Sequence, residues 1–288
     1  MTAGRDLTFF LAGDTHYGLS EKTAAYNQSI IDAMNSLPGT PYPEEIAAGT
    51  VEKPRGVIVV GDLVEEGDGE FGSEQWEEFI RDFGVCGEGR IAFPVYEGFG
   101  NHDGGKDHPI RKGIKIRNTK RPGLVHISKN GYHYSWDWDG IHFIQLNLFP
   151  GTEADRIINP WGKYFAGSWK EPLDSLKFLK LDLKKYAEAK DQPVIIFMHY
   201  GFDEWGLGWW SERERNVFYK TIKNYNILAI FWGHIHKVQS IKWKGIPTFC
   251  VGSTQKSNGP GEFLVVHIKD NAMYVMERKL RRWGVVYK

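Results

Sequence analysis

The sequence is poor in cysteine, which limits the kinds of metal site it can build. Only two cysteines, Cys86 and Cys250, occur in 288 residues. Their wide separation matches no metal-ligand spacing, so a zinc site built on paired cysteines is excluded. The sequence leaves open whether the two thiols pair with each other, and we expect buried free thiols.

The chain also lacks an excess of charge of either sign. Lys and Arg together number 36, as do Asp and Glu, which gives a formal net charge of +0. A protein that binds nucleic acid through bulk positive charge is therefore not expected, although a local basic patch could hide in this average. No stripe of alternating basic and aromatic residues is present either, so we do not predict nucleic acid as a partner.

Long apolar runs are missing as well. No segment approaches the ~20 apolar residues of a membrane span. Residues 1–6 lead directly into an apolar run without the pattern of a signal peptide. These features favour the cytoplasm, but a chain from which a signal had been removed would look the same and would belong in the periplasm or outside the cell. No linker divides the sequence, which predicts one domain over residues 1–288. Protein partners and oligomeric state cannot be predicted.

Five short apolar runs are present, and each predicts a buried strand. They alternate with segments of helical periodicity, which favours a βαβ-type core. The predicted strands are 7–12, 56–60, 91–96, 194–198 and 227–232, and the predicted helices are 20–34, 73–83, 172–185 and 211–223. Residues 132–149 and the tail 238–287 instead show alternation and hairpin turns, which predict antiparallel sheet.

Each apolar run is followed directly by polar side chains. Gly100-Asn101-His102-Asp103 is an example, and taken alone it would be a turn, since Asn, Asp and Gly favour turns. The pattern recurs, however, after all five runs, at Asp14 and His16, Asp62, Asn101 and His102, His199, and His234 and His236. The carboxyl ends of parallel strands lie along one edge of a sheet, so we expect these side chains to converge.

These residues offer imidazole nitrogen, carboxylate oxygen and one amide oxygen, without a thiolate. Mixed nitrogen and oxygen donors suit Mn, Fe, Zn or Co and disfavour Ca. Eight candidate residues are too many for one ion and suffice for two, which a carboxylate would bridge. The pattern therefore predicts a centre of two divalent or trivalent ions.

The series Gly-Asp14-x-His16, Gly-Asp62, Gly-Asn101-His102-Asp103, His199 and Gly-His234-x-His236 resembles the calcineurin-like metallophosphoesterases. All five blocks stand in the family's order and span residues 13–236. The resemblance implies a four-layer α/β/β/α sandwich with two mixed β-sheets. It also implies a phosphoric ester hydrolase that cleaves phosphomonoesters or phosphodiesters with a hydroxide activated by two metal ions.

The resemblance further implies roles for individual residues. Asp14, His16 and His236 would hold one ion, Asn101, His199 and His234 the other, and Asp62 would bridge them. His102 would be the general acid at the leaving group, oriented by Asp103.

Two neighbouring regions could contact the substrate. Asn101 and His102 lie at the reacting end, and Arg111 and Arg117 follow them in the chain. Arginine suits bidentate phosphate binding, but a solvated basic loop is an equal alternative. The Trp-rich loop 205–210 could form a wall of the cleft. A small-molecule phosphoester is the expected substrate.

The sequence departs from two branches of the family. Glu65 stands where the purple acid phosphatase branch has Tyr, which argues against an iron–tyrosinate site. The Asp-Arg-Gly run of the protein phosphatase branch is also missing after Asp62. Two alternatives remain open: a cyclic nucleotide phosphodiesterase, and a non-catalytic protein-interaction module on the same fold. His126, His133, His142 and His267 are expected to be surface or half-buried strand residues rather than ligands.

Overall fold

A computed structural model describes residues 5–46, 49–152, 168–187, 191–270 and 272–287. Within this part of the chain the helices are α1 (Thr23–Ser36), α2 (Gly72–Asp82), α3 (Pro109–Asn118), α4 (Ser175–Tyr186) and α5 (Glu212–Ile222), with short 3₁₀ turns at Ser168–Lys170 and Trp205–Gly208. The parallel strands that lead to the candidate site are β1 (Asp6–Ala12), β2 (Val57–Val60), β3 (Val95–Gly98), β7 (Pro193–Phe197) and β8 (Asn226–Trp232).

The remaining strands complete two large mixed sheets. They are β4 (Leu124–Ile127), β5 (Tyr134–Trp138), β6 (Ile141–Gln145), β9 (Val238–Trp243), β10 (Ile246–Val251), β13 (Phe263–Lys269), β14 (Ala272–Lys279) and β15 (Arg282–Tyr287), and a small ribbon is formed by β11 (Gln255–Lys256) and β12 (Gly259–Pro260). The six-stranded sheet has the order β15-β14-β13-β1-β2-β3, and the seven-stranded sheet has the order β4-β5-β6-β7-β8-β10-β9. The predicted mixed α/β fold with two mixed sheets is confirmed.

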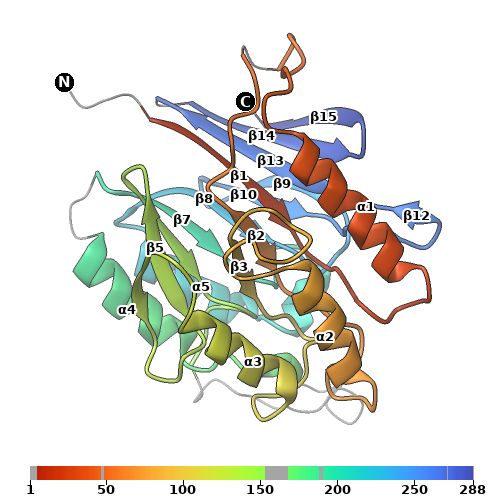
Figure 1. Cartoon of the computed structure of the whole chain (residues 1–288). Coiled ribbons are helices and arrows are strands. Elements are labelled where there is room, and N and C mark those ends of the chain that lie inside the picture. The colour runs from red at the N-terminus through yellow and green to blue at the C-terminus, as the bar shows by residue number, and fades with distance from the viewer. Residues whose placement is uncertain (1–4, 47–48, 153–167, 188–190, 271, 288) are drawn as a thin grey trace.

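Aromatic side chains fill the space between the two sheets. Phe9 of β1 meets Phe143 of β6 edge to face at 5.5 Å between ring centroids, and it contacts Phe197 of β7 and Phe231 of β8 in the same way. Such pairs stabilise the core beyond the burial of their area. In Figure 1, α1 and α2 lie on one side of the sheets and α4 on the other. The inter-sheet core thereby fixes the relative position of the strands that carry the candidate site.

The predicted and observed boundaries of some elements differ because residues there form other hydrogen bonds in place of those of a helix or strand. The first predicted helix starts at Thr23 and not at Ser20, because the backbone N–H and hydroxyl of Ser20 both lie within hydrogen-bond distance of the Thr23 hydroxyl. A strand was predicted at 91–96, but the observed strand β3 begins four residues later, at Val95. Ile91 and Ala92 instead donate their backbone N–H groups to the Asp82 carbonyl and the Asn35 side chain. Helix α3, with Pro109 in its first turn, was not predicted.

Two local features match their sequence patterns closely. Ser211 caps α5 in a reciprocal capping box with Glu214, as a Ser-x-x-Glu pattern favours. The hairpin between β5 and β6 turns at Asp139 and Gly140, which both have positive φ, as a type I′ turn requires. Both features depend on residues that are close together in the chain, so a sequence pattern is enough to indicate them.

The two cysteines are free, but only Cys250 is buried, so the expectation of a buried thiol is wrong for Cys86. None of the described helices has the length and apolar character needed to cross a membrane.

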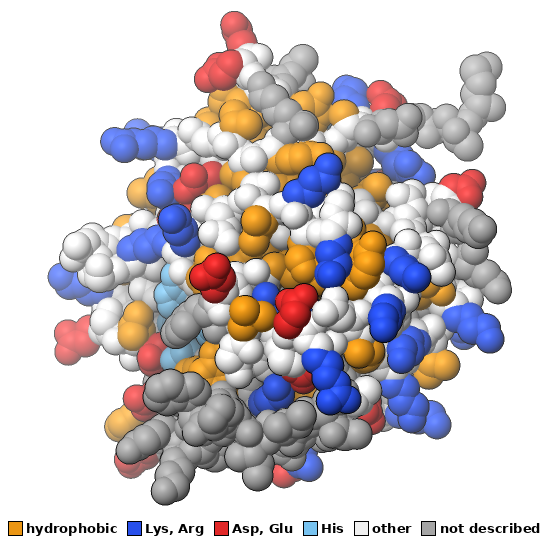
Figure 2. Space-filling model, turned by 180° about the vertical axis from the view of Figure 1, so that it is seen from behind, with side chains coloured by type: hydrophobic (Ala, Val, Ile, Leu, Met, Phe, Trp, Pro, Cys, Tyr) orange, Lys and Arg blue, Asp and Glu red, His pale blue; other side chains and the backbone are white. Residues whose placement is uncertain are grey.

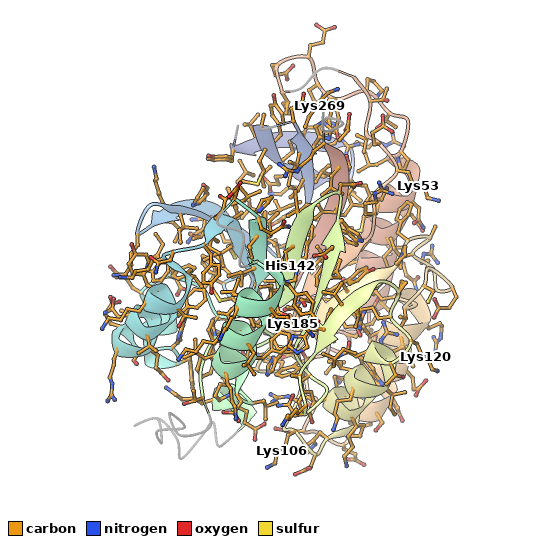
Figure 3. The ribbon with its side chains drawn as sticks, turned by 90° about the vertical axis from the view of Figure 1, so that its left-hand side faces the viewer. Lys53, Lys106, Lys120, His142, Lys185 and Lys269 are labelled. Atoms are coloured by element: carbon orange, nitrogen blue, oxygen red, sulfur yellow. The ribbon has the colours of Figure 1, made fainter. Side chains whose placement is uncertain are left out.

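A buried polar cluster joins α4 to the seven-stranded sheet (Figure 3). His142 of β6 lies 2.7 Å from Asp137 and 2.7 Å from Asp182 of α4, and Ser135 and His126 contact the same Asp182 carboxylate. Burial lowers the pKa of His142, but its two carboxylate partners outweigh this and raise the pKa to about 9. His133, His142 and His267 are buried and His126 is half-buried, more enclosed than expected.

This cluster predicts a pH dependence of stability. The folded pKa of His142 lies above its ordinary value of 6.5, so its contribution is fully present below pH 6.5 and is lost as the pH rises through about 9. The free energy of unfolding should fall by about 3 kcal/mol across this window. In urea titrations at several pH values, His142→Gln should flatten the decline, whereas the exposed control His108→Gln should retain it. An equally steep decline in His142→Gln would contradict the assignment.

Candidate metal centre

The polar residues predicted at the strand ends lie together at one edge of the two sheets. Asp14 and His16 follow β1, Asp62 follows β2 and Asn101 follows β3 of the six-stranded sheet, while His199 follows β7 and His234 and His236 follow β8 of the seven-stranded sheet. All seven positions are buried except His236, which is half-exposed. The two sheets therefore supply facing halves of one site.

One group of potential ligands contains Asp14, His16, Asp62 and His236. The Nε2 atoms of His16 and His236 are 2.9 Å apart, and the Nε2 of His236 lies 3.4 Å from Oδ1 of Asp14. The Nε2 of His16 lies 3.7 Å from Oδ2 of Asp62. These four side chains thus direct donor atoms toward a common point.

A second group contains Asp62, His199 and His234. The Nε2 of His199 lies 3.1 Å from Oδ2 of Asp62 and 3.1 Å from Oδ1 of Asn101. The Nδ1 of His199 is 2.9 Å from the carbonyl oxygen of Val60. A carbonyl oxygen can only accept, so Nδ1 carries a hydrogen and Nε2 is the ring nitrogen that faces the site. Asp62 belongs to both groups.

The backbone at these positions is unusual. Asp14, His16, Asp62, His234 and His236 all have positive φ, at 50°, 42°, 49°, 75° and 53°. Residues other than glycine seldom adopt this conformation, which costs about 1–2 kcal/mol for an ordinary side chain. The glycine that precedes Asn101 is also explained by the structure. A Cβ at Gly100 would collide with Oδ1 of Asp62. The strand ends are bent sharply so that their side chains converge.

The buried carboxylate of Asp62 and the imidazoles around it shift one another's pKa values. Burial raises the pKa of Asp62, but the surrounding imidazoles, chiefly His199, outweigh this and hold it well below its usual range. Burial lowers the pKa of His199, yet Asp62 more than compensates and raises it to about 9. Burial and the nearby His199 charge lower the pKa of His234 to about 3. The buried Asp62 carboxylate therefore stays ionised in the protein and requires positive charge nearby.

The chemistry of these residues fits metal ions. The nitrogens of His16 and His236 face each other at 2.9 Å with carboxylate oxygens beside them, and a cation there would coordinate all of them. The Nδ2 atom of Asn101 is buried without a hydrogen-bond partner among the described residues, while its Oδ1 points at His199. The donor set is nitrogen and oxygen throughout, as predicted, and the groups could hold two ions that share Asp62.

A family model supports this interpretation of the site. The model of the calcineurin-like phosphoesterases matches residues 7–238. The chain belongs to this family. It is therefore a metallophosphoesterase, a phosphoric ester hydrolase by class, as the strand-end motifs predicted. Comparison with curated proteins gives no match.

Solved structures share the fold of this phosphoesterase. A dimetal phosphatase from Danio rerio has a TM-score of 0.62 at 13% identity, with 98% of this chain and 99% of that chain covered. GAP50, described as the anchor in the inner membrane complex of Plasmodium, has a TM-score of 0.59 at 13% identity, with 98% and 87% covered. At these identities the similarity shows the fold alone.

The structure of the phosphoesterase gives Asp103 a different role from the one predicted. Its Oδ1 accepts from the backbone N–H groups of Leu63 and Val64, and its Oδ2 accepts from that of Gly100. The carboxylate therefore ties the loop after β2 to the loop after β3. This geometry differs from the expectation that Asp103 orients the His102 imidazole directly, because Nδ1 of His102 lies instead 2.8 Å from the Glu65 carbonyl oxygen.

The arginines predicted to bind substrate form ion pairs with buried acids. Arg111 is buried with Nη1 2.8 Å from Glu171, and its guanidinium lies over the Phe99 ring. Arg117 binds Glu97 at 2.7 Å, and Arg121 reaches the same carboxylate at 2.6 Å. These contacts hold α3 and the following loop against β3. They differ from the prediction that Arg111 and Arg117 contact the substrate, and the acidic partners lie too far away in sequence to be recognised there.

Glu65 was noted in the sequence only as a departure from related branches, yet the structure places it in the site. Its Oε2 lies 2.7 Å from Nδ1 of His16, and its Oε1 lies 3.8 Å from Nδ1 of His102. His16, Glu65 and His102 form a third group of closely spaced donors. A carboxylate behind a ligand histidine fixes the ring and increases its basicity. The position of Glu65, three residues after the candidate ligand Asp62, was the only feature of the sequence that could have indicated its place in the site.

We expect Glu65→Gln to reduce both metal affinity and turnover by about 10- to 100-fold, because the His16 ring loses its charged partner. Isothermal titration with Mn²⁺ and the kcat for p-nitrophenyl phosphate provide the two measurements. Glu66→Gln is the matched control, since Glu66 neighbours Glu65 but is exposed and should leave metal affinity unchanged. Equal metal affinity in Glu65→Gln and the wild type would refute the role.

A cavity of about 360 Å³ opens beside the centre, lined by Glu65, Glu66, Gly67, Asp68, Gly69, Asn101, His102 and Trp169. The aromatic residue that lines this cavity lies outside the loop 205–210 that was predicted to form a wall. Trp169 lines this cavity and is backed by Trp209 at 5.2 Å between ring centroids, whereas Trp210 is fully buried against Phe149 and Phe218.

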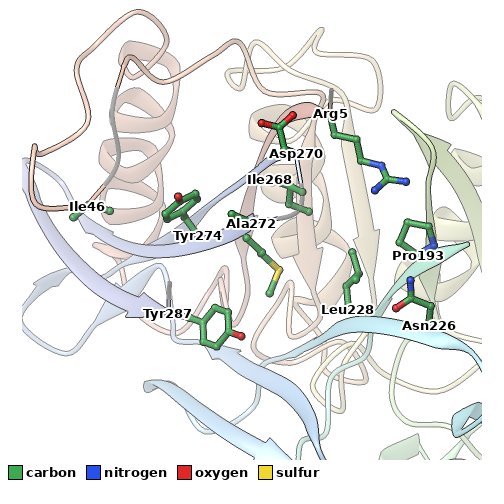
Figure 4. A pocket seen from close by; sticks show the side chains of 11 residues that line it. Arg5, Ile46, Pro193, Asn226, Leu228, Ile268, Asp270, Ala272, Tyr274 and Tyr287 are labelled. Carbon is green, nitrogen blue, oxygen red and sulfur yellow. The ribbon is translucent and has the colours of Figure 1, made fainter. Parts of the chain in front are cut away.

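A larger cavity, of about 840 Å³, lies at the opposite ends of the strands (Figure 4). Pro193 and Asn226, the first residues of β7 and β8, line it together with Arg5. Its position excludes it from the metal centre.

Proposed function

We propose that this chain hydrolyses small-molecule phosphate esters, monoesters or diesters, with two divalent or trivalent ions such as Mn, Fe or Zn. The observation that carries the proposal is the shared position of Asp62 between two groups of ligands. Asp14, His16 and His236 would hold one ion, and Asn101, His199 and His234 the other. When bound, the pair would supply a water of lowered pKa and positive charge for the phosphate oxygens.

The protein's own residues set the geometry for this chemistry. Asp62 accepts the backbone N–H of His102 at 2.9 Å, so the bridging carboxylate also places the candidate proton donor. Nδ1 of His102 donates to the Glu65 carbonyl oxygen, which leaves Nε2 for the substrate. Burial lowers the pKa of His102, but the nearby Asp62 charge outweighs this and raises it. His102 is thus suited to protonate a leaving oxygen.

The direct test combines metal content with hydrolysis. Purified protein loaded with Mn²⁺, Zn²⁺ or Fe²⁺ should contain about two ions per chain and cleave p-nitrophenyl phosphate or bis-p-nitrophenyl phosphate. Chelation should abolish the activity and lower the melting temperature, because the ions bind only the folded site. If the fully loaded protein left both esters intact, the proposed function would be wrong.

A non-catalytic module on this fold is the second candidate. GAP50, which shares the fold, is described as an anchor. An interaction module has no need to keep buried ligands, whereas all seven candidate ligands are present here and converge. Absence of bound metal after loading would favour the module. A cyclic nucleotide phosphodiesterase is a special case of the leading proposal and would appear in a substrate panel.

Nucleic acid is not proposed as a substrate. Figure 2 shows Lys and Arg side chains spread over the face seen from behind, with Asp and Glu among them, rather than one continuous basic stripe. A single domain and a cytoplasmic location stay predictions from the sequence.

A further inference from the structure

The cavity beside the metal centre has a composition that discriminates between leaving groups. His102, the candidate proton donor, lines it together with Trp169 and three carboxylates, Glu65, Glu66 and Asp68. No Lys or Arg is among the described residues that line it. Since His102 would protonate the departing oxygen, the alcohol part of the ester would occupy this space.

The aromatic wall of the cavity is held in place from behind. The Trp169 ring lies 5.3 Å from the His102 ring and 5.2 Å from the Trp209 ring, between centroids. The Tyr200 hydroxyl donates to the Trp169 carbonyl oxygen at 2.8 Å. The Trp169 indole is therefore held in position before a ligand binds. Little side-chain entropy is lost when a ligand contacts it.

The loop that carries Glu66 and Asp68 is held at its backbone and at the Asp68 carboxylate. Gly67 donates its backbone N–H to the His102 carbonyl oxygen at 2.8 Å, and Gly105 donates to Oδ1 of Asp68 at 2.8 Å. His108 lies 3.1 Å from the same carboxylate oxygen, outside the set of lining residues. Glu66 is exposed and Asp68 is 49% exposed, so both can reach a ligand in the cavity.

A buried polar group also borders this space. Asn101 is 1% exposed, lines the cavity, and has no hydrogen-bond partner for Nδ2 among the described residues. This amide could donate to an ester oxygen at the boundary between the metal centre and the cavity. The cavity is thereby continuous with the reacting centre.

We propose that the preferred substrate is a phosphate ester whose alcohol carries an ammonium group, a refinement that rests on the proposed function. An indole ring beside carboxylates attracts an alkylammonium or quaternary ammonium ion through cation–π and Coulomb interactions. The carboxylates of the cavity repel a leaving group that bears a carboxylate or a second phosphate. Trp169, Glu66 and Asp68 determine this specificity, and Glu65 contributes charge while it holds His16.

The test compares two esters of the same shape. Phosphocholine and 3,3-dimethylbutyl phosphate differ only in having nitrogen or carbon at the centre of the trimethyl group, so the ratio of their kcat/KM values isolates the charge. We expect this ratio to be about ten in the metal-loaded enzyme. Phosphoglycolate, with an anionic leaving group, should be the poorest substrate. For an ester that is not turned over, its Ki against bis-p-nitrophenyl phosphate gives the same comparison.

Variants locate the preference in the cavity. Glu66→Gln and Trp169→Leu should each lower the ratio about two- to fivefold, while Glu70→Gln, an exposed acid of the same loop outside the cavity, should leave it unchanged. A ratio near one in an enzyme that cleaves p-nitrophenyl esters would overturn this inference alone. Failure to cleave any p-nitrophenyl ester would instead overturn the proposed function.

Discussion

Replacing Asp62 by Asn should reduce kcat/KM on the order of a thousandfold or more and remove most of the bound metal. Asp62 is the residue whose carboxylate lies within reach of His16 in one ligand group and His199 in the other, at 3.7 and 3.1 Å. Asn keeps the size and an oxygen for the His102 backbone N–H, so the loop can stay folded. Only the charge that the two proposed ions would share is lost.

Metal analysis and the kcat/KM for p-nitrophenyl phosphate measure this effect on the same sample. Asp191→Asn is the control for the loss of one carboxylate, because Asp191 is exposed near the start of β7, at the other end of a strand that leads to the site. Circular dichroism should show the same secondary structure in both variants. Full metal content together with activity within tenfold of wild type would show that Asp62 does not bridge two ions.

Replacing His102 by Ala should lower turnover about 10²- to 10⁴-fold while the metal stays bound. The variant keeps the backbone N–H that donates to Asp62, and the two ligand groups that contain Asp62 keep all their members. What it loses is the imidazole whose Nε2 is free for the leaving oxygen. The loss should be largest for alkyl phosphates, which need a proton on departure, and smallest for p-nitrophenyl phosphate.

The neighbouring residue provides the contrast. Asn101→Ala removes an amide oxygen 3.1 Å from His199 and should weaken one metal site without changing the dependence on the leaving group. Titration of each variant with Mn²⁺ and rates for esters of graded leaving-group pKa separate the two roles. Loss of metal in His102→Ala with retention in Asn101→Ala would reverse the assignment.

The sequence revealed the parts of the site that depend on local order along the chain. An apolar run followed by Gly-Asp62 or Gly-His234 marks the end of a buried strand, and parallel strands end at one edge. This geometry follows from pleated-sheet pairing and requires no knowledge of side-chain contacts. The arrangement in two mixed sheets was expected from the family resemblance, whereas the hairpin at Asp139 and Gly140 follows from its own turn residues.

The sequence could not reveal contacts that join distant segments. Arg117 lies close to the site along the chain, but Glu97 holds its guanidinium inside the fold. The sequence predicts that Asp103 orients its neighbour His102, whereas its carboxylate accepts hydrogen bonds from backbone N–H groups of the loop after β2. Glu65 and Trp169 were not predicted as members of the site, because each approaches His102 only through the folding of loops. Side-chain partnership across loops is decided by tertiary packing.

The left-handed backbone at the ligand positions has a consequence for how this chain can change over time. His16, His234 and His236 hold a conformation that glycine adopts freely, whereas a side chain in this conformation carries a steric cost of about 1–2 kcal/mol. Substitution by glycine at any of these positions would thus remove a candidate ligand without adding backbone strain.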